Sequence, residues 1–311
     1  MNPALMQRRG PFMHSGVTSR GLARWTLIAA LPACLGAVWR AGWPAALVLI
    51  SSMTAAWLAD ALAKRRVAPH EATLLTGVSL ALMMPRGAPW WLGAVGGVLA
   101  VLVAKHSFGG QRRNVFNPSA FARIILMVAL PAYFLAPAAA DAVTGATPLA
   151  KEFGASQRSL TELLGGDSFG SLAQAWPLAV IAGGLFLVAL RVSDWRVPLA
   201  YLTSVALCAA LLPAGPRVTG HAPWLAQDVA THVFAGGTLL AAFFLLTDPV
   251  TSPVTRQSRI LFAALAGAFT MVVRFYTPYP DGAALAVVAA NATAPFLDRW
   301  ADRSALARVS P

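Results

Sequence analysis

The chain has 311 residues, of which 57% are hydrophobic and only 12% charged, and its mean hydropathy is +0.63. Soluble domains carry about 25% charged residues, so this composition excludes an ordinary soluble globular protein and predicts an integral membrane protein with many spans. The net charge of +12 does not indicate nucleic-acid binding, because Lys and Arg collect in the cytoplasmic loops of membrane proteins.

The apolar segments, taken in chain order, number ten. Several are shorter than the ~20 residues of a full span, or are interrupted by Pro and Gly. They cover residues 22–39, 43–62, 71–85, 88–104, 118–137, 175–190, 197–212, 229–247, 260–275 and 282–298. The sequence therefore predicts one integral all-α membrane domain over residues 1–311, in which a polar loop, 138–174, separates two halves, 22–137 and 175–298.

The basic residues set the predicted orientation. With both termini in the cytoplasm and ten crossings, seventeen of the 24 Lys and Arg residues fall inside and six fall outside. No cleavable signal peptide is evident, and the basic N-terminus leads into the first span. This topology predicts a multi-pass protein of a bacterial inner membrane, embedded in the lipid bilayer, with the 138–174 loop in the periplasm.

A weak internal repeat relates the two halves. The first copy has a short Gly-led segment at 76–85 and a polar turn at 114–120; the second has 236–249 and 279–284. The predicted topology puts the first polar turn inside and the second outside, which is the pattern of an inverted repeat. Chance likeness between apolar sequences rich in Gly and Pro is the alternative.

One threonine in the predicted periplasmic loop has a hydroxyl that is accessible for covalent modification. The stretch 138–150 contains Asp141, Thr144, Gly145, Ala146 and Thr147, followed by Pro148. The proline biases Thr147 toward an extended backbone, and the small residues before it leave its hydroxyl accessible. A hydroxyl presented in this way suits covalent modification by another enzyme, but four small residues are a weak motif. On this stretch alone, an ordinary turn stabilised by the hydroxyl is the commoner interpretation.

Six polar residues gather at the turns near the membrane. Polar groups at this depth are costly unless they are paired or face a cavity, so these side chains are candidates for the lining of a site for a polar ring system. For Asn117 and Asp281, helix capping is an equally good interpretation. The six are Asn114, Asn117, Thr247, Asp248, Tyr279 and Asp281.

The sequence shows no catalytic site or metal site of its own. It contains no Gly-rich phosphate loop, no nucleophile–base pair and no cluster of metal ligands. Cys34 and Cys208 lie far apart in apolar runs without CxxC spacing, so they do not predict a disulfide or a metal centre within this chain. A pair shared with a partner chain stays open.

Four ordered blocks together resemble the family of RnfD and NqrB, flavin-carrying membrane subunits of ion-pumping electron-transfer complexes. The resemblance covers about 70–298, and the short N-terminus is more similar to RnfD of the Rnf complex. The blocks are Phe108-Gly-Gly with Asn114-Val-Phe-Asn117-Pro118; Asp141-Ala-Val-Thr144-Gly145-Ala146-Thr147-Pro-Leu; Phe244-Leu-Leu-Thr247-Asp248-Pro249-Val-Thr; and Tyr279-Pro-Asp281-Gly282.

The resemblance implies that Thr147 carries FMN through a phosphoester bond, installed by a periplasmic flavin transferase. It also implies a urea-transporter-like fold of two inverted five-helix repeats, and leaves room for riboflavin or another non-covalent flavin. The expected function is electron relay in a multi-subunit complex that links a low-potential carrier to NAD and exports Na⁺ or H⁺. Asp141 is a candidate for recognition by the transferase.

The chain departs from the family pattern in one place. Gln111, Arg112 and Arg113 replace a glycine-containing run, and Ser119 stands where the family tends to have Ala. Partner contacts and any second flavin site are therefore open there. Two other functions stay open: a urea-transporter-like channel, and a flavinylated membrane subunit of a different electron-transfer chain.

Overall fold

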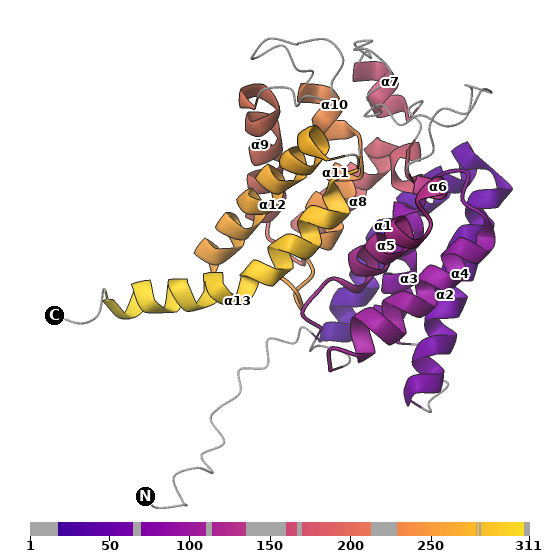
Figure 1. Ribbon diagram of the computed structural model, residues 1–311, viewed down its shortest axis with the longest axis horizontal. Helices are drawn as coiled ribbons and strands as arrows, with labels where there is room; N and C mark the ends of the chain where they lie inside the picture. The colour runs from indigo at the N-terminus through magenta and orange to yellow at the C-terminus, as the bar shows by residue number, and fades with distance from the viewer. Residues whose placement is uncertain are drawn as a thin grey trace, which may run out of the picture.

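The computed structural model describes residues 18–64, 70–109, 114–134, 160–166, 170–212, 229–277, 279 and 281–307. Within these residues the chain is an all-α membrane protein, and its successive secondary-structure elements are all helices (Figure 1). A helix lies in each of the ten apolar segments. Three described helices are long and apolar enough to cross a membrane by themselves: Arg20–Ala41, Trp43–Lys64 and Arg256–Tyr276.

The first half contains α1 to α6. Its helices are α1 (Ser19–Ala41), α2 (Trp43–Lys64), α3 (Glu71–Met83), α4 (Trp90–Val101) with a π-helical continuation η2 (Leu102–His106), α5 (Pro118–Ala129) and α6 (Pro131–Phe134). The predicted segment 118–137 is not one helix, because Pro131 keeps Leu130 out of the helical region at φ −132° and ψ 57°.

The remaining elements form the second half and the connection to it. They are α7 (Leu160–Gly165), the 3₁₀ turn η3 (Leu172–Ala175), α8 (Pro177–Ala189), α9 (Arg196–Leu211), α10 (Val229–Phe234), α11 (Thr238–Leu240) with the π-helical η4 (Ala241–Leu245), α12 (Arg256–Tyr276) and α13 (Ala283–Ala307). The predicted segment 229–247 is broken at Gly236 and Gly237, which both have positive φ. The last helix also runs beyond the predicted end at 298.

Helices α2 and α4 pack through glycines. A Cβ atom on Gly97 would lie 2.5 Å from the carbonyl oxygen of Ser52, and one on Gly93 would lie 2.8 Å from that of Val48. Two glycines four residues apart therefore let the two helix backbones touch, as small residues commonly do between helices in membranes.

Helices α5 and α13 cross in opposite directions and join the two halves. The Asn291 side chain of α13 accepts a hydrogen bond of 2.9 Å from the backbone N–H of Asn117, at the start of α5. Farther along α5, Arg123 forms an ion pair of 2.5 Å with Asp281, at the start of α13. The first residues of each helix thus contact the middle of the other helix.

A first prediction concerns the glycine contact. Gly97→Ala should lower the thermal unfolding midpoint in detergent, since the new methyl group would overlap the Ser52 carbonyl, and overpacking costs about 1–3 kcal/mol. Gly87→Ala is the matched control, because a Cβ there meets no atom of the described residues within 4 Å. Equal midpoints for the two variants would contradict the close packing of α2 on α4.

A second prediction concerns the buried ion pair. Asp281→Asn keeps the side-chain oxygen that accepts from the Ala283 N–H but removes the charge opposite Arg123. Leaving a buried charge without its partner costs about 3–5 kcal/mol, so this variant should unfold at a clearly lower temperature. The double change Arg123→Met with Asp281→Asn should recover most of the loss, because it removes the unpaired charge and keeps the acceptor for the Ala283 N–H. A double variant no more stable than the single one would argue against the pairing.

Candidate functional site

Residues 138–159 of the predicted loop lie outside the described residues, and with them Asp141, Thr144, Gly145, Ala146 and Thr147. The described helices nearest to it in the chain, α6 and α7, lie at the end of the molecule opposite the end of α13 (Figure 1). The Arg40 guanidinium at the end of α1 donates to the carbonyl oxygen of Gly165 in α7. Modification of Thr147 therefore stays a prediction. The helices on either side of its loop, α6 and α7, lie at the same end of the molecule.

A cavity of about 130 Å³ lies at the other end of α1, between the two halves of the chain. Leu22, Ala23 and Thr26 belong to its wall, eighteen to fourteen residues before Arg40. At a rise of 1.5 Å per residue, Leu22 and Arg40 are about 27 Å apart, close to the ~30 Å thickness of a bilayer core. The cavity and the flanks of the predicted flavin loop therefore sit near opposite faces.

The wall of the cavity combines polar groups with an apolar surface. The polar residues are Thr26, Thr76, Ser79, Lys105, Asn114, Asn117, Ser119, Ser193, Thr247 and Asp248, and the apolar ones include Leu22, Leu75, Leu187, Val192 and Phe244. A site of this kind suits a small ligand that has both polar and apolar surface.

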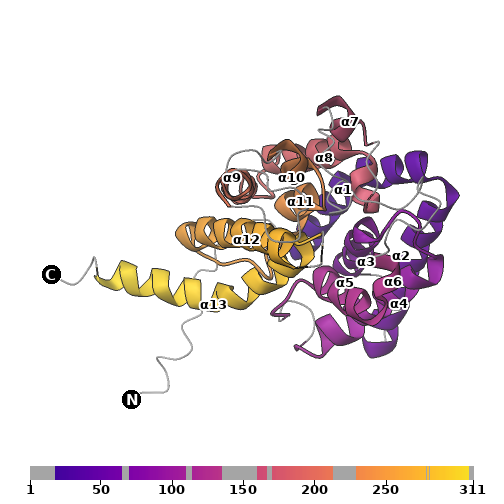
Figure 2. The ribbon, with the colours of Figure 1, turned by 45° about the horizontal axis from the view of Figure 1, so that its top comes forward.

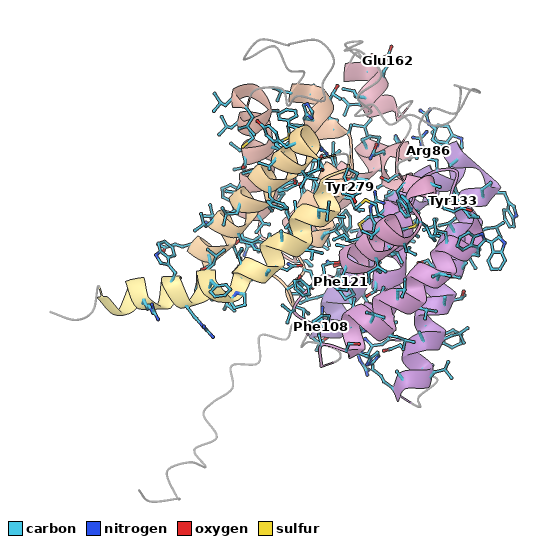
Figure 3. The ribbon with its side chains drawn as sticks, viewed as in Figure 1. Arg86, Phe108, Phe121, Tyr133, Glu162 and Tyr279 are labelled. Carbon is cyan, nitrogen blue, oxygen red and sulfur yellow. The ribbon has the colours of Figure 1, made fainter. Side chains whose placement is uncertain are left out.

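Four of the six predicted polar residues meet at this cavity: Asn114, Asn117, Thr247 and Asp248. Tyr279 and Asp281 are not among its lining residues. The reason is the antiparallel packing of α5 and α13, which carries the start of α13 away from the start of α5. In Figure 3, Tyr279 accordingly lies well apart from Phe108 and Phe121, which flank the Asn114–Asn117 turn.

Asn117 is both a helix cap and a wall residue. Its side-chain oxygen accepts hydrogen bonds from the N–H groups of Ser119 and Ala120, at 3.1 and 3.2 Å, and so caps α5. Its amide nitrogen lies 3.4 Å from the carbonyl oxygen of Leu245, at the end of η4. The start of a helix in the first half thus meets the end of a helix in the second half at the cavity.

Thr247 and Asp248 are held by local bonds. The Thr247 hydroxyl donates to the Phe243 carbonyl at 2.7 Å, and one Asp248 oxygen accepts from the Val250 N–H at 3.1 Å. Asp248 therefore behaves as a turn residue that also borders the cavity. Asn114 donates to the Phe116 carbonyl at 3.3 Å, which fixes the turn before α5.

Lys105 brings a charge to the cavity that the sequence patterns did not predict. It is 3% exposed, and its Nζ donates to Thr73 Oγ1 at 2.8 Å and lies 3.8 Å from the Asp60 carboxylate. Asp60 also accepts from Thr73 at 2.8 Å and contacts His106 Nε2 at 2.9 Å. The signal in the sequence was Asp60 itself, an acidic residue inside an apolar run, where ionisable residues are expected to have partners.

Ser193 is another wall residue that was not predicted. Its hydroxyl oxygen is buried at the cavity wall and has no hydrogen-bond partner among the described residues. A buried hydroxyl without a partner costs about 1–3 kcal/mol, which a ligand in the cavity would recover. No sequence pattern marked this residue, because it lies in the short 190–195 turn, where serine is common.

The chain is similar to known proteins over nearly its whole length. The sequence model of the NQR2, RnfD, RnfE family matches residues 6–307. The chain is 34% identical to the D subunit of the ion-translocating oxidoreductase complex of Halorhodospira halophila, over 94% of this chain and 92% of that protein. The protein of the same name from Escherichia fergusonii is also 34% identical, over 93% and 95%.

A third relative carries a more specific name. It is the D subunit of the Na(+)-translocating ferredoxin:NAD(+) oxidoreductase complex of Acetobacterium woodii, 33% identical over 93% of this chain and 91% of that protein. The resemblance that four sequence blocks indicated is therefore confirmed at the level of the family. This chain belongs to the NQR2, RnfD, RnfE family.

Proposed function

We propose that the chain is a membrane flavoprotein subunit of a redox-driven ion translocase of the Rnf type, with FMN esterified to Thr147. The observation that carries the proposal is the family match, which runs over residues 6–307 and so includes the 141–148 motif. The relatives are named as subunits of ion-translocating complexes, one of them for ferredoxin and NAD(+). We infer electron transfer to NAD and export of Na⁺ or H⁺ for this chain's complex from these names and from the family resemblance.

The proposed topology puts the threonine loop in the periplasm of a bacterial inner membrane, within reach of a flavin transferase. The excess of Lys and Arg in the other set of loops supports this orientation. The flanking helices α6 and α7 occupy the end of the molecule away from the charged end of α13, as this orientation requires (Figure 1).

The proposed architecture is ten spans in two inverted five-helix repeats. The antiparallel packing of α5 and α13 supports this architecture. The two helices start at opposite ends of their contact, and the start of each lies against the middle of the other. Broken helices are a second support: α10 and α11 are separated at Gly236 and Gly237, and α5 begins at a polar turn beside the cavity. Inverted repeats build their central sites from such interrupted helices.

We assign the cavity to a non-covalently bound flavin. The wall fits a flavin ring: Phe244 and Leu187 offer apolar surface, Lys105 and Asn114 offer donors, and Ser193 has an unused hydroxyl. A bound flavin supplies one- and two-electron chemistry. The chain's residues would orient the ring, exclude water from it and place one ammonium charge near it.

Thr147→Val tests the covalent site. When the chain is produced together with a flavin transferase, the unchanged protein should gain the mass of one FMN ester and fluoresce on a denaturing gel. The valine variant should lose both signals, because it has no hydroxyl to esterify, while it still inserts into the membrane. Ser156→Ala, another hydroxyl change in the same loop, is the control and should keep the flavin. Covalent flavin in the valine variant would overturn the assignment, and its absence from the unchanged chain would favour the channel.

The cavity assignment makes a separate prediction. Denaturing the Thr147→Val protein should release a flavin that was bound without a covalent bond. Ser193→Ala removes one hydrogen-bonding group and should weaken this binding roughly fivefold, in line with the ~1 kcal/mol of a single hydrogen bond. Ser193→Leu should abolish it by filling the space. The measurement is equilibrium titration of the flavin-free protein with riboflavin, and unchanged affinity in the leucine variant would refute the assignment.

A further inference from the structure

The last part of α13 extends past the rest of the molecule. The helix continues through Pro295 to Ala307, and its final turns run sideways beyond the neighbouring helices (Figures 1 and 2). The extension is also visible in Figure 2, where the molecule is turned by 45°, so it is not an effect of one viewing direction. We refer to residues 296–307 as the α13 extension.

Hydrogen bonds to the base of α12 hold the extension in place. The Asp298 carboxylate accepts from the backbone N–H groups of Val254 and Thr255, and the Ser258 hydroxyl donates to the Leu297 carbonyl at 2.9 Å. Thr255 is the N-cap of α12, one of the three described helices able to cross a membrane alone. The extension therefore leaves the body at the level where α12 enters the bilayer.

The two faces of the extension differ in character. Leu297 is partly buried against the core and Ala301 is 6% exposed, and both face the body. On the outward face, Phe296 is 68% exposed and Trp300 is 54% exposed. The spacing of four residues puts these two aromatic rings on one side of the helix.

Two arginines border the aromatic rings. Arg299 and Arg303 are exposed, and helical spacing puts both on the same outward side as Phe296 and Trp300. Large exposed aromatic rings beside arginines are typical of helices that lie in a membrane interface. There the rings sit at headgroup level, and the guanidinium groups reach the lipid phosphates.

We propose that the α13 extension is an interfacial helix, which lies in the plane of the membrane surface and binds anionic lipid headgroups through Arg299 and Arg303. The level of the extension favours lipid over a protein partner, because its attachment to the N-cap of α12 holds it at the height of the headgroups. The extension contains Asp298 and Asp302 as well as Arg299 and Arg303, so its formal net charge is zero. The two arginines lie on the outward side and are complementary to an anionic surface, whereas Asp298 is hydrogen-bonded to the start of α12. This inference does not depend on the flavin sites or on the coupling ion.

Spin labels on the full-length chain test the proposal. With Cys34 and Cys208 replaced by Ala, single labels at Phe296→Cys and Trp300→Cys are examined in bilayers that contain phosphatidylglycerol. Collisions with oxygen should be more frequent, and collisions with a water-soluble nickel complex less frequent, than for a free nitroxide in buffer. A label at Leu207→Cys, an exposed apolar position of α9, gives the reference for the lipid core.

The charge contribution is tested with Arg299→Gln and Arg303→Gln together. At about 1 kcal/mol for each arginine near an anionic surface, the ratio of interface-bound to water-exposed label should fall roughly thirtyfold. The fall should occur in anionic bilayers and not in bilayers of phosphatidylcholine alone. Arg20→Gln, an exposed arginine at the start of α1, is the control and should change nothing.

Two results would overturn the proposal. One is a label at residue 296 or 300 that is as accessible to the nickel complex as the free nitroxide, whatever the lipid. The other is protection that is missing in the isolated chain and present only with other membrane subunits, since the face would then bind a protein. The arginine changes lie on an exposed face, so the variants can be compared by their unfolding midpoints to show that they are folded.

Discussion

The antiparallel crossing of α5 and α13 is the constraint on which the rest of the structure depends. Buried backbone polar groups need partners within the protein, so a helix whose first residues are buried, as those of α5 are, must have its first N–H groups bound. Asn117 does this for α5 with its own side chain, and Asn291 accepts from the N–H of Asn117 itself. At the other end of the crossing, Asp281 binds the Ala283 N–H and pairs with Arg123.

The cavity is a consequence of this crossing. Since α5 starts at a polar turn and η4 ends beside it, the two halves cannot close against each other with apolar side chains there. Asn117, Thr247 and Asp248 satisfy their local bonds and still border the space between the halves. Lys105 adds a charge whose counter-ion, Asp60, belongs to α2 in the first half. A site lined in this way is polar enough for a ligand to be oriented, yet bounded by apolar helices.

The sequence predicted what depends on local patterns and composition. The apolar runs located the helices, and Asn-Pro at 117–118 predicted the cap of α5, which the structure contains. Four family blocks predicted the membership that the comparisons confirm. What depends on long-range packing was not predicted. The separation of Asp281 from Asn117 requires the direction in which α13 crosses α5, and the Lys105–Asp60 contact joins residues from two helices. The end of α13 was placed too early, because a mixed charged and aromatic stretch is not typical of a membrane span.

The same crossing also limits how the two faces can communicate. Helix α5 borders the cavity through Asn117 and holds Asp281 through Arg123, so one helix contacts both the cavity and the start of α13. A packed helix moves as a unit, and coupling between distant sites needs an element that both sites can bias. Under the proposed function, a change of charge in the cavity acts on the turn that positions α5. A shift of α5 strains or relieves the Arg123–Asp281 pair at its other contact. The α5–α13 pair therefore links the cavity to the start of α13, the end of that helix opposite the α13 extension.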